Sequence, residues 1–340
     1  MDAVENRDGR TSVKRMLLAG ATGYIGRAVA SELVRRRYEV VAIVRETAAG
    51  KTARNLEELR ATLPGCDVRV ASMSDPAQLE AALEGVTIDA AVSCIASRSG
   101  APADAWRVDC DANRNLLAAA RRGGASHFVL LSAICVQRPQ LAFQRAKLAF
   151  EAALQESGIT YSIVRPTAFF KSLAGQVGRV QAGRPFLVFG DGCATACKPI
   201  SEADLADFIV NCLEDPALAN RILPVGGPGP AITPQEQGEL LCTLAGRPTR
   251  IRRVSPKLFD AAIAVLTPLS RIIPSLEAKA EFARIGRYYA TESMLLWDEA
   301  AQAYDAEATP SYGSDTLKDF YARVLREGLV GQELGEQKLF

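Results

Sequence analysis

The most constraining feature of this sequence is a glycine-rich turn, Gly20-Ala-Thr-Gly23-Tyr-Ile-Gly26, between an apolar run and a helical pattern. Residues 16–19 predict a buried strand, and residues 26–37 carry apolar side chains at helical spacing. In such a turn the first glycine permits a tight bend, the second lets the backbone approach a pyrophosphate, and the third lets helix and strand pack closely. The free amides at the helix start then face the phosphates. We therefore predict a dinucleotide-binding turn whose cofactor contacts are Gly20, Ala21, Thr22, Gly23, Tyr24, Ile25 and Gly26.

Short apolar runs alternate with longer amphipathic ones up to residue 165. The second run, residues 39–44, is dense in β-branched side chains, as in parallel strands that are buried on both faces. Further strands are expected at 68–71, 88–93, 127–131 and 161–164, and helices at 52–62, 75–84, 104–122 and 141–156. This order predicts an α/β fold, a doubly wound and mostly parallel Rossmann sheet with right-handed crossovers.

The regular alternation weakens after residue 165. Short strands are expected at 186–189 and 222–225, and helices at 201–213, 233–245, 256–285 and 316–328. We predict three regions: an N-terminal tail (1–13), a cofactor-binding domain (14–165) and a smaller, mainly helical substrate-binding lobe (166–340). The lobe is expected to be interleaved with the last strands of the sheet, over the strand ends where ligands bind.

The residue after the second strand indicates which dinucleotide binds. Enzymes that use NAD usually have Asp or Glu there, whereas this chain has Arg45, with Lys51 close behind. A carboxylate would repel a 2′-phosphate, and a guanidinium can bind one through two hydrogen bonds. We therefore predict NADPH, the alternative being that Arg45 is a solvated charge. Three further cofactor contacts are predicted at strand ends: Ser93, Cys94 and Pro166.

Composition excludes several classes of function. The net charge of +1 gives no basis for nucleic-acid binding. Eight cysteines accompany one histidine, His127, so we expect free thiols, no metal site and a cytoplasmic location. The longest apolar stretch, 259–273, contains Pro268 and Arg271 and is too short to span a bilayer, which leaves peripheral membrane contact open. Nothing in the sequence indicates an oligomeric state.

Candidate catalytic residues follow the fifth expected strand. Ser132 ends that strand, and Lys147 lies on the next helix within Phe143-Gln-Arg-Ala-Lys147. These placements resemble the short-chain dehydrogenase/reductase superfamily, whose site combines Ser with Tyr-x-x-x-Lys. That resemblance implies catalytic roles for Ser132, Phe143 and Lys147, with Lys147 on the nicotinamide ribose; a surface lysine is the alternative. Phe143 replaces the usual tyrosine and cannot donate a proton. Two interpretations follow: Phe143 is a plain packing residue, or the enzyme reduces a bond whose reduction forms no oxyanion.

A narrower resemblance rests on the stretches 143–151, 164–172 and 197–206, and on Tyr288 and Tyr289 near the C-terminus. These are similar to the divinyl chlorophyllide a 8-vinyl reductase family. The resemblance implies NADPH-dependent reduction of the 8-vinyl group of divinyl chlorophyllide or protochlorophyllide to ethyl, in chlorophyll or bacteriochlorophyll synthesis. The conjugated macrocycle would carry the charge that an oxyanion carries elsewhere, so no tyrosine is needed at position 143. Water, Lys171 or a C-terminal tyrosine remain open as the proton donor.

A flat tetrapyrrole needs an apolar slot with a few polar groups. We predict that Phe169, Phe170 and Phe189 line it, with core packing as the alternative. The basic stretch 247–257 suits the substrate propionate, a membrane headgroup or simply solvent. Two rival functions stay open: an NADPH-binding regulator or complex subunit without catalysis, and an isoflavone-reductase-like reductase of another conjugated double bond.

Overall fold

The centre of the molecule is a seven-stranded parallel sheet. The computed structural model describes residues 14–45 and 56–328. The sheet order is β3-β2-β1-β4-β5-β6-β8, and every neighbouring pair is parallel. Its strands are β1 (Arg15–Ala19), β2 (Glu39–Val44), β3 (Cys66–Val70), β4 (Ala90–Ser93), β5 (His127–Leu131), β6 (Thr160–Pro166) and β8 (Arg221–Val225). The predicted doubly wound fold is confirmed.

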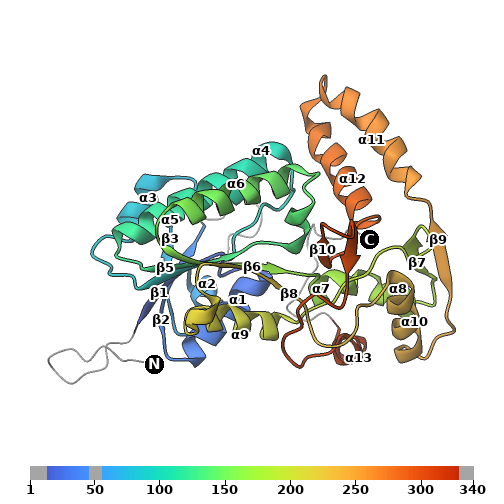
Figure 1. The fold of residues 1–340 in the computed structure, drawn as a ribbon, viewed down its shortest axis with the longest axis horizontal. Coiled ribbons are helices and arrows are strands. Elements are labelled where there is room, and N and C mark those ends of the chain that lie inside the picture. The colour runs from blue at the N-terminus through green and yellow to red at the C-terminus, as the bar shows by residue number, and fades with distance from the viewer. Residues whose placement is uncertain (1–13, 46–55, 329–340) are drawn as a thin grey trace.

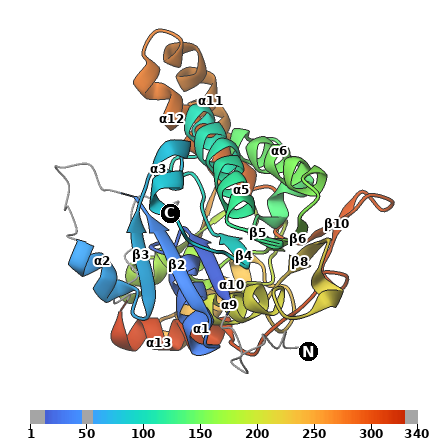
Figure 2. The same cartoon turned by 90° about the vertical axis from the view of Figure 1, so that its left-hand side faces the viewer.

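Helices cover both faces of the sheet (Figures 1 and 2). One face carries α3 (Pro76–Ala82), α5 (Asn113–Arg122) and α6 (Ala142–Glu156), and the other carries α1 (Tyr24–Arg35) and α9 (Glu202–Asn211), with α2 (Leu56–Thr62) close to β3. Successive strand residues point to opposite faces, so Leu17 and Leu18 enter different apolar clusters, each fully buried. The sheet therefore separates two hydrophobic cores.

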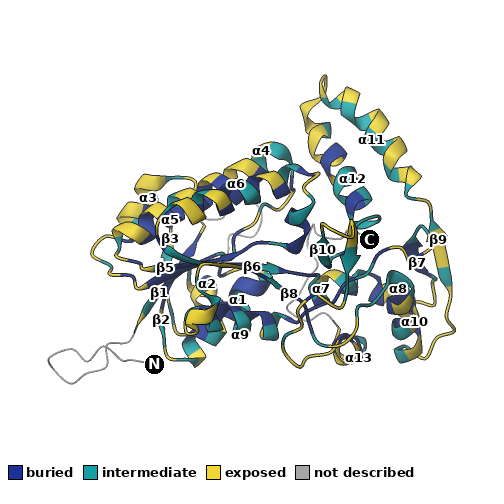
Figure 3. Cartoon of the chain, in the orientation of Figure 1, coloured by how far each residue is buried: buried dark blue, intermediate teal, exposed yellow. Residues whose placement is uncertain are grey.

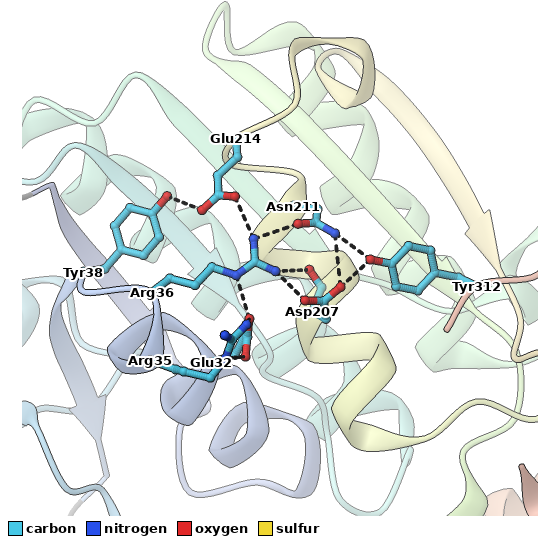
Figure 4. Close-up of polar contacts among 8 residues, drawn as sticks. All are labelled: Glu32, Arg35, Arg36, Tyr38, Asp207, Asn211, Glu214 and Tyr312. Atoms are coloured by element: carbon cyan, nitrogen blue, oxygen red, sulfur yellow. Dashed lines mark hydrogen bonds and ion pairs between the residues drawn. The ribbon is translucent and has the colours of Figure 1, made fainter. Parts of the chain in front are cut away.

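The end of α1 is held to α9 by Arg36, whose side chain is only 14% exposed (Figure 4). Its guanidinium lies 2.6 Å from a Glu32 oxygen and reaches three residues near the end of α9. These contacts are Asp207 at 2.5 Å, Asn211 at 2.7 Å and Glu214 at 2.7 Å. Because α1 begins at the carboxyl edge of the sheet and runs back, this network lies at the opposite, amino edge.

A smaller lobe lies beyond the carboxyl edge of the sheet. It contains a two-stranded parallel sheet, β7 (Phe186–Phe189) with β9 (Ile251–Val254), and a short antiparallel pair, β10 (Leu296–Asp298) with β11 (Ala303–Asp305). Its helices are α7 (Phe170–Leu173), α8 (Val177–Gln181), α10 (Pro234–Leu244) and α13 (Leu317–Glu327). Their buried side chains form a third core, which includes Phe170, Leu241 and Tyr321.

Two helices, α11 (Lys257–Ser270) and α12 (Glu277–Tyr289), form a hairpin that projects from the body (Figure 1). The prediction of one helix over 256–285 is wrong, because the chain turns at 271–276. Ile273 adopts an extended conformation (φ −122°, ψ 92°), since the following Pro274 disfavours helical backbone in the residue before it. Within the described residues, no helix has the length and apolar content to cross a bilayer.

Candidate cofactor and active site

The glycine turn is built as a phosphate cradle between β1 and α1. Gly20 has a φ of +82°, and a Cβ there would lie 2.6 Å from the backbone of Cys94. A Cβ on Gly26 would lie 2.0 Å from the carbonyl oxygen of Gly20. Helix α1 has no side-chain cap and no acidic residue in its first turn, which suits an anion at its free amides. The turn also lies where the strand order reverses, between β1 and β4, so this site fits a dinucleotide pyrophosphate.

Three guanidinium groups gather beyond the end of β2. Desolvation, followed by the positive charges of Arg98 and Arg107, lowers the pKa of Arg45, whereas Asp104 opposes that effect. Arg107 pairs with Asp104 at 2.7 Å. Arg45 and Arg98 have no carboxylate partner within 4.0 Å among the residues described, so they suit a phosphate. Arg98 was not among the predicted contacts, and its only sequence signal is its place in the loop after β4; Lys51 lies outside the described residues.

Lys147 is buried beside Asp109. Its Nζ lies 3.1 Å from Asp109 Oδ1, and the two side chains are 10% and 0% exposed. The same Oδ1 makes no hydrogen bond of good geometry within the described part of the chain. The other carboxylate oxygen, Oδ2, accepts a hydrogen bond from the amide of Ser97 at 3.4 Å. The pair is thus a buried ionic contact with unused hydrogen-bonding capacity, which a ribose hydroxyl would match.

Asp109 is positioned by a π-helix, Trp106–Ala112, which lies between α4 (Pro102–Ala105) and α5. The prediction of an unbroken helix over 104–122 did not include it. Asn113, directly after the π-helix, accepts a hydrogen bond from Ser93 at 2.6 Å and donates one to the carbonyl of Asp109 at 3.0 Å. The predicted contact residue Ser93 therefore supports the Asp109 segment through its hydroxyl. Sequence reasoning missed Asp109.

Ser132 is buried, and its hydroxyl donates to Glu151, one helical turn after Lys147. Glu151 also pairs with Arg165, whose Nε lies 3.3 Å from Oε1. The oxygen of Ser132 keeps the capacity to accept a hydrogen bond, although its proton is committed to Glu151. Its catalytic role stays a prediction.

Helix α12 brings two tyrosines to the loop after β5. The hydroxyl of Tyr288 donates to the carbonyl of Cys135 at 3.0 Å. Tyr289 packs in the same cluster, as does the half-buried Phe143, and its hydroxyl interacts with the Cys135 thiol. Burial raises the pKa of both the Tyr289 hydroxyl and the Cys135 thiol, and the Lys147 charge opposes this at Cys135. A tyrosine hydroxyl from the distant hairpin therefore lies on the Lys147 side of the site.

The predicted substrate-binding phenylalanines lie in different packing groups. Phe169 packs 6.3 Å from the ring of Tyr24, and Phe189 lies 5.0 Å from the ring of Phe259 on α11. Phe170 is 2% exposed inside the core of the lobe, so it has no surface to offer a ligand. Pro166 is buried at the end of β6.

Lys171 also belongs to the glycine-turn side of the site, with its Nζ 5.1 Å from the centroid of the Tyr24 ring. Desolvation, followed by the charge of Arg27, lowers the pKa of Lys171. Its ammonium group therefore lies beside the phosphate cradle.

Residues 20–216 match a protein family described as NAD(P)H-binding. The chain is 53% identical over 331 residues to divinyl chlorophyllide a 8-vinyl-reductase, chloroplastic, of Oryza sativa subsp. indica, covering 96% of this chain and 82% of that protein. It is 50% identical over 330 residues to the protein of the same name from Arabidopsis thaliana, covering 95% and 79%.

The fold is also similar to solved structures of low sequence identity. The binary complex of leucoanthocyanidin reductase with NADPH from Vitis vinifera gives a TM-score of 0.66 at 17% identity, covering 92% of this chain and 100% of that one. This likeness concerns the fold alone.

Proposed function

This chain belongs to the divinyl chlorophyllide a 8-vinyl-reductase family, and on that premise we propose that it reduces the 8-vinyl group of divinyl chlorophyllide a to ethyl, with NADPH as reductant. The observation that carries the proposal is identity of at least 50% across 95% or more of the chain, which spans the cradle, the Lys147 helix and the C-terminal lobe. Protochlorophyllide with the same vinyl group is the alternative substrate. All eight cysteines are free, which supports a cytoplasmic location as a further proposal, although the named plant relatives are chloroplastic.

The choice of NADPH rests on Arg45 and Arg98. The family match makes the ligand a nicotinamide dinucleotide, and the 2′-phosphate is the group that separates the two forms. Two guanidinium groups without a carboxylate partner in the described residues favour that phosphate. The residue that follows β2 directly is Arg45, not the Asp or Glu that usually binds a free ribose hydroxyl.

The site residues divide the work of the reaction. When bound, the dinucleotide would supply a hydride, and the protein would direct the matching proton, so that the vinyl double bond gains two hydrogens. Lys147, held by Asp109, orients the ribose through its ammonium group. Phe143 presents an apolar ring where related enzymes place a proton donor, so that part of the site offers apolar contact to a flat ring system.

Among the side chains considered as proton donor, which are Lys171, Tyr288 and Tyr289, Tyr289 has the most support. Lys171 lies against Tyr24, and Tyr288 uses its hydroxyl to bind the Cys135 carbonyl. The Tyr289 hydroxyl contacts the Cys135 thiol on the Lys147 side of the site, and its raised pKa keeps it protonated until a strongly basic carbon centre forms beside it. Tyr289→Phe should therefore lower kcat about 100-fold while the dissociation constant for NADPH stays unchanged. An unchanged kcat would show that Tyr289 is not the proton donor and would favour water instead.

The direct test combines a pigment assay with a binding assay. Purified full-length protein is mixed with NADPH and divinyl chlorophyllide a, and a blue shift of the Soret band reports loss of vinyl conjugation. NADPH binding is titrated separately by its fluorescence. Arg45→Met should weaken NADPH binding about 10-fold and leave NADH binding unchanged, whereas Arg122→Met, at the far edge of the sheet, serves as the matched control.

Each result of this test bears on a different part of the proposal. NADPH binding without reduction of either pigment would favour the non-catalytic alternative. Equal binding of NADH and NADPH would remove the cofactor assignment but not the reductase. Phe143→Tyr is expected to change the rate of vinyl reduction, and an unchanged rate would show that position 143 does not tune the chemistry.

A further inference from the structure

Helix α11 is exposed or half-buried along its whole length (Figure 3), and its exposed face carries an apolar stripe. The stripe consists of Leu258, Ala261, Val265 and Leu269, whose spacing places them on one face of the helix, and of Ile272 in the turn that follows. Ile272 at the hairpin tip is 80% exposed and Leu258 at the base is 63% exposed. Six of the nine exposed large apolar side chains within residues 14–45 and 56–328 lie between 258 and 282. Such concentration of apolar surface indicates an interaction site.

The stripe is carried on a braced arm. A Cβ on Gly286 of α12 would lie 2.6 Å from the ring of Phe259, so the two helices pack closely at the base. Along the hairpin, Arg287 pairs with Asp260 at 2.8 Å and Arg284 binds Thr267 at 2.7 Å. The face opposite the stripe is therefore occupied by α12, and the stripe itself is directed away from the body.

Positive charge stands at both ends of the stripe. Residues 250–289 hold eight basic and three acidic residues, although the whole chain has a net charge of only +1. Two of the three carboxylates, Asp260 and Glu281, are paired with arginines. Lys257 and Arg271 stand at the two ends of the stripe without an ion pair in the described structure. Apolar side chains bordered by unpaired cations are typical of a helix that lies in an anionic membrane interface.

We propose that the α11–α12 hairpin docks this protein on an anionic lipid surface, with Ile272 and Ile273 inserted among the lipid chains and Lys257 and Arg271 at the headgroups. A second copy of the chain fits less well. In an antiparallel, two-fold pairing of two stripes, Arg271 of one copy would lie beside Lys257 of the other, and like charges repel. The stripe is also only about 21 Å long at 1.5 Å per residue, which gives a small contact for a stable dimer.

The hairpin links this surface to the lobe beyond the sheet. Phe259 at its base packs on Phe189, and Ile285 on α12 lies near Phe143 and Gly100. An apolar pigment that resides in lipid would thus reach a protein already held at the same surface. This advantage rests on the proposed function, whereas lipid docking itself does not depend on the identity of the substrate.

The test measures lipid binding without substrate. Full-length protein is centrifuged with vesicles of phosphatidylcholine and phosphatidylglycerol, and with vesicles of phosphatidylcholine alone. The wild-type protein should bind the mixed vesicles and lose binding at high salt. Ile272→Gln with Ile273→Gln should reduce the partition coefficient about 10- to 100-fold, and Lys257→Gln with Arg271→Gln should reduce it about 10-fold on the mixed vesicles. Ile222→Gln, an exposed position on β8, is the matched control.

The two proposals fail separately. Vinyl reduction of pigment dispersed in detergent should be equal for the wild type and the Ile272/Ile273 variant, because these residues lie outside the site. Wild-type protein that ignores both kinds of vesicle, or a variant that binds as well as the wild type, would overturn lipid docking. A dimer measured by light scattering that the same variant dissociates would assign the stripe to a second copy and also overturn it.

Discussion

Helices α1 and α11 are similar in length and differ in what covers them. Five of the twelve residues of α1 are buried, whereas none of the fourteen residues of α11 is, although α11 has the more apolar sequence. Helix α1 lies between the sheet and α9, whereas α11 packs mainly on α12 and reaches β7 at its base through Phe259. The comparison teaches that position in the fold, and not apolar content, decides whether a helix contributes to the stability of the core.

The largest effect should come from the start of α1. Gly26→Ala places a Cβ 2.0 Å from the Gly20 carbonyl, so the turn must open. We expect the free energy of unfolding to fall by about 3 kcal/mol, with NADPH binding lost. Chemical denaturation and fluorescence titration measure the two effects. Gly178→Ala on α8, where a Cβ meets nothing within 4 Å, should be neutral or slightly stabilising; equal loss in both variants would contradict the cradle geometry.

The far end of α1 should give the next largest effect. Arg36→Met leaves Glu32, Asp207 and Glu214 without their shared partner, and we expect a loss of about 2 kcal/mol. The control is Arg35→Met, because Arg35 is largely exposed and, within the described residues, forms an ion pair with Glu32 alone. Its loss should leave the denaturant midpoint of unfolding nearly unchanged, because solvent screens an exposed ion pair. If the two variants unfold at the same denaturant concentration, the network does not hold α1 to α9.

Lowering the pH should reduce the free energy of unfolding through the single histidine of the chain, His127. Burial lowers the pKa of His127 on β5 to about 4, against about 6.5 in an unfolded chain. Between these values the unfolded chain binds a proton that the folded chain does not, so stability falls as the pH drops from about 6.5 to 4. Allowing for partial solvent screening, we expect a contribution of about 1 kcal/mol. His127→Gln should flatten the pH dependence of unfolding by that amount, and an unaltered profile would show that His127 titrates normally.

The smallest effect is expected on α11. Leu258→Ala removes a side chain that is 63% exposed, so the free energy of unfolding should change by less than about 0.5 kcal/mol. Leu33→Ala on α1, where the side chain is fully buried, should cost about 3 kcal/mol in the same measurement. A similar loss of unfolding free energy in both variants would mean that another surface covers α11 in solution, and that the two helices do not differ in burial.

The parallel sheet could be predicted closely because its strands are buried on both faces and are therefore apolar throughout. The bounds predicted for 39–44 and 127–131 agree with β2 and β5. Strand β9 was not predicted, because its sequence Ile-Arg-Arg-Val exposes both arginines at the edge of a two-stranded sheet and has the appearance of a basic loop. The turn at 271–276 was missed because apolar spacing continues across it.

The candidate site also has a part that the sequence predicts and a part that it does not. The glycine turn was predictable because its chemistry is local, and the structure places its residues around one cradle. Asp109, Arg98 and the position of Tyr289 were not, because each depends on contacts between distant elements. Asp109 in particular pairs with Lys147 from within a π-helix, and the residue pattern of 106–112 does not predict that widened turn.

The π-helix has a consequence for how this chain should be compared with others. A π turn holds more residues than an α turn, so 106–112 behaves like a one-residue insertion within a continuous helix. Against a relative without that bulge, a correct alignment would need a gap inside 102–122. Deleting one residue there would preserve a helix but rotate Asp109 or Asn113 out of register. The segment would then keep its secondary structure and lose the side-chain contacts that the site uses.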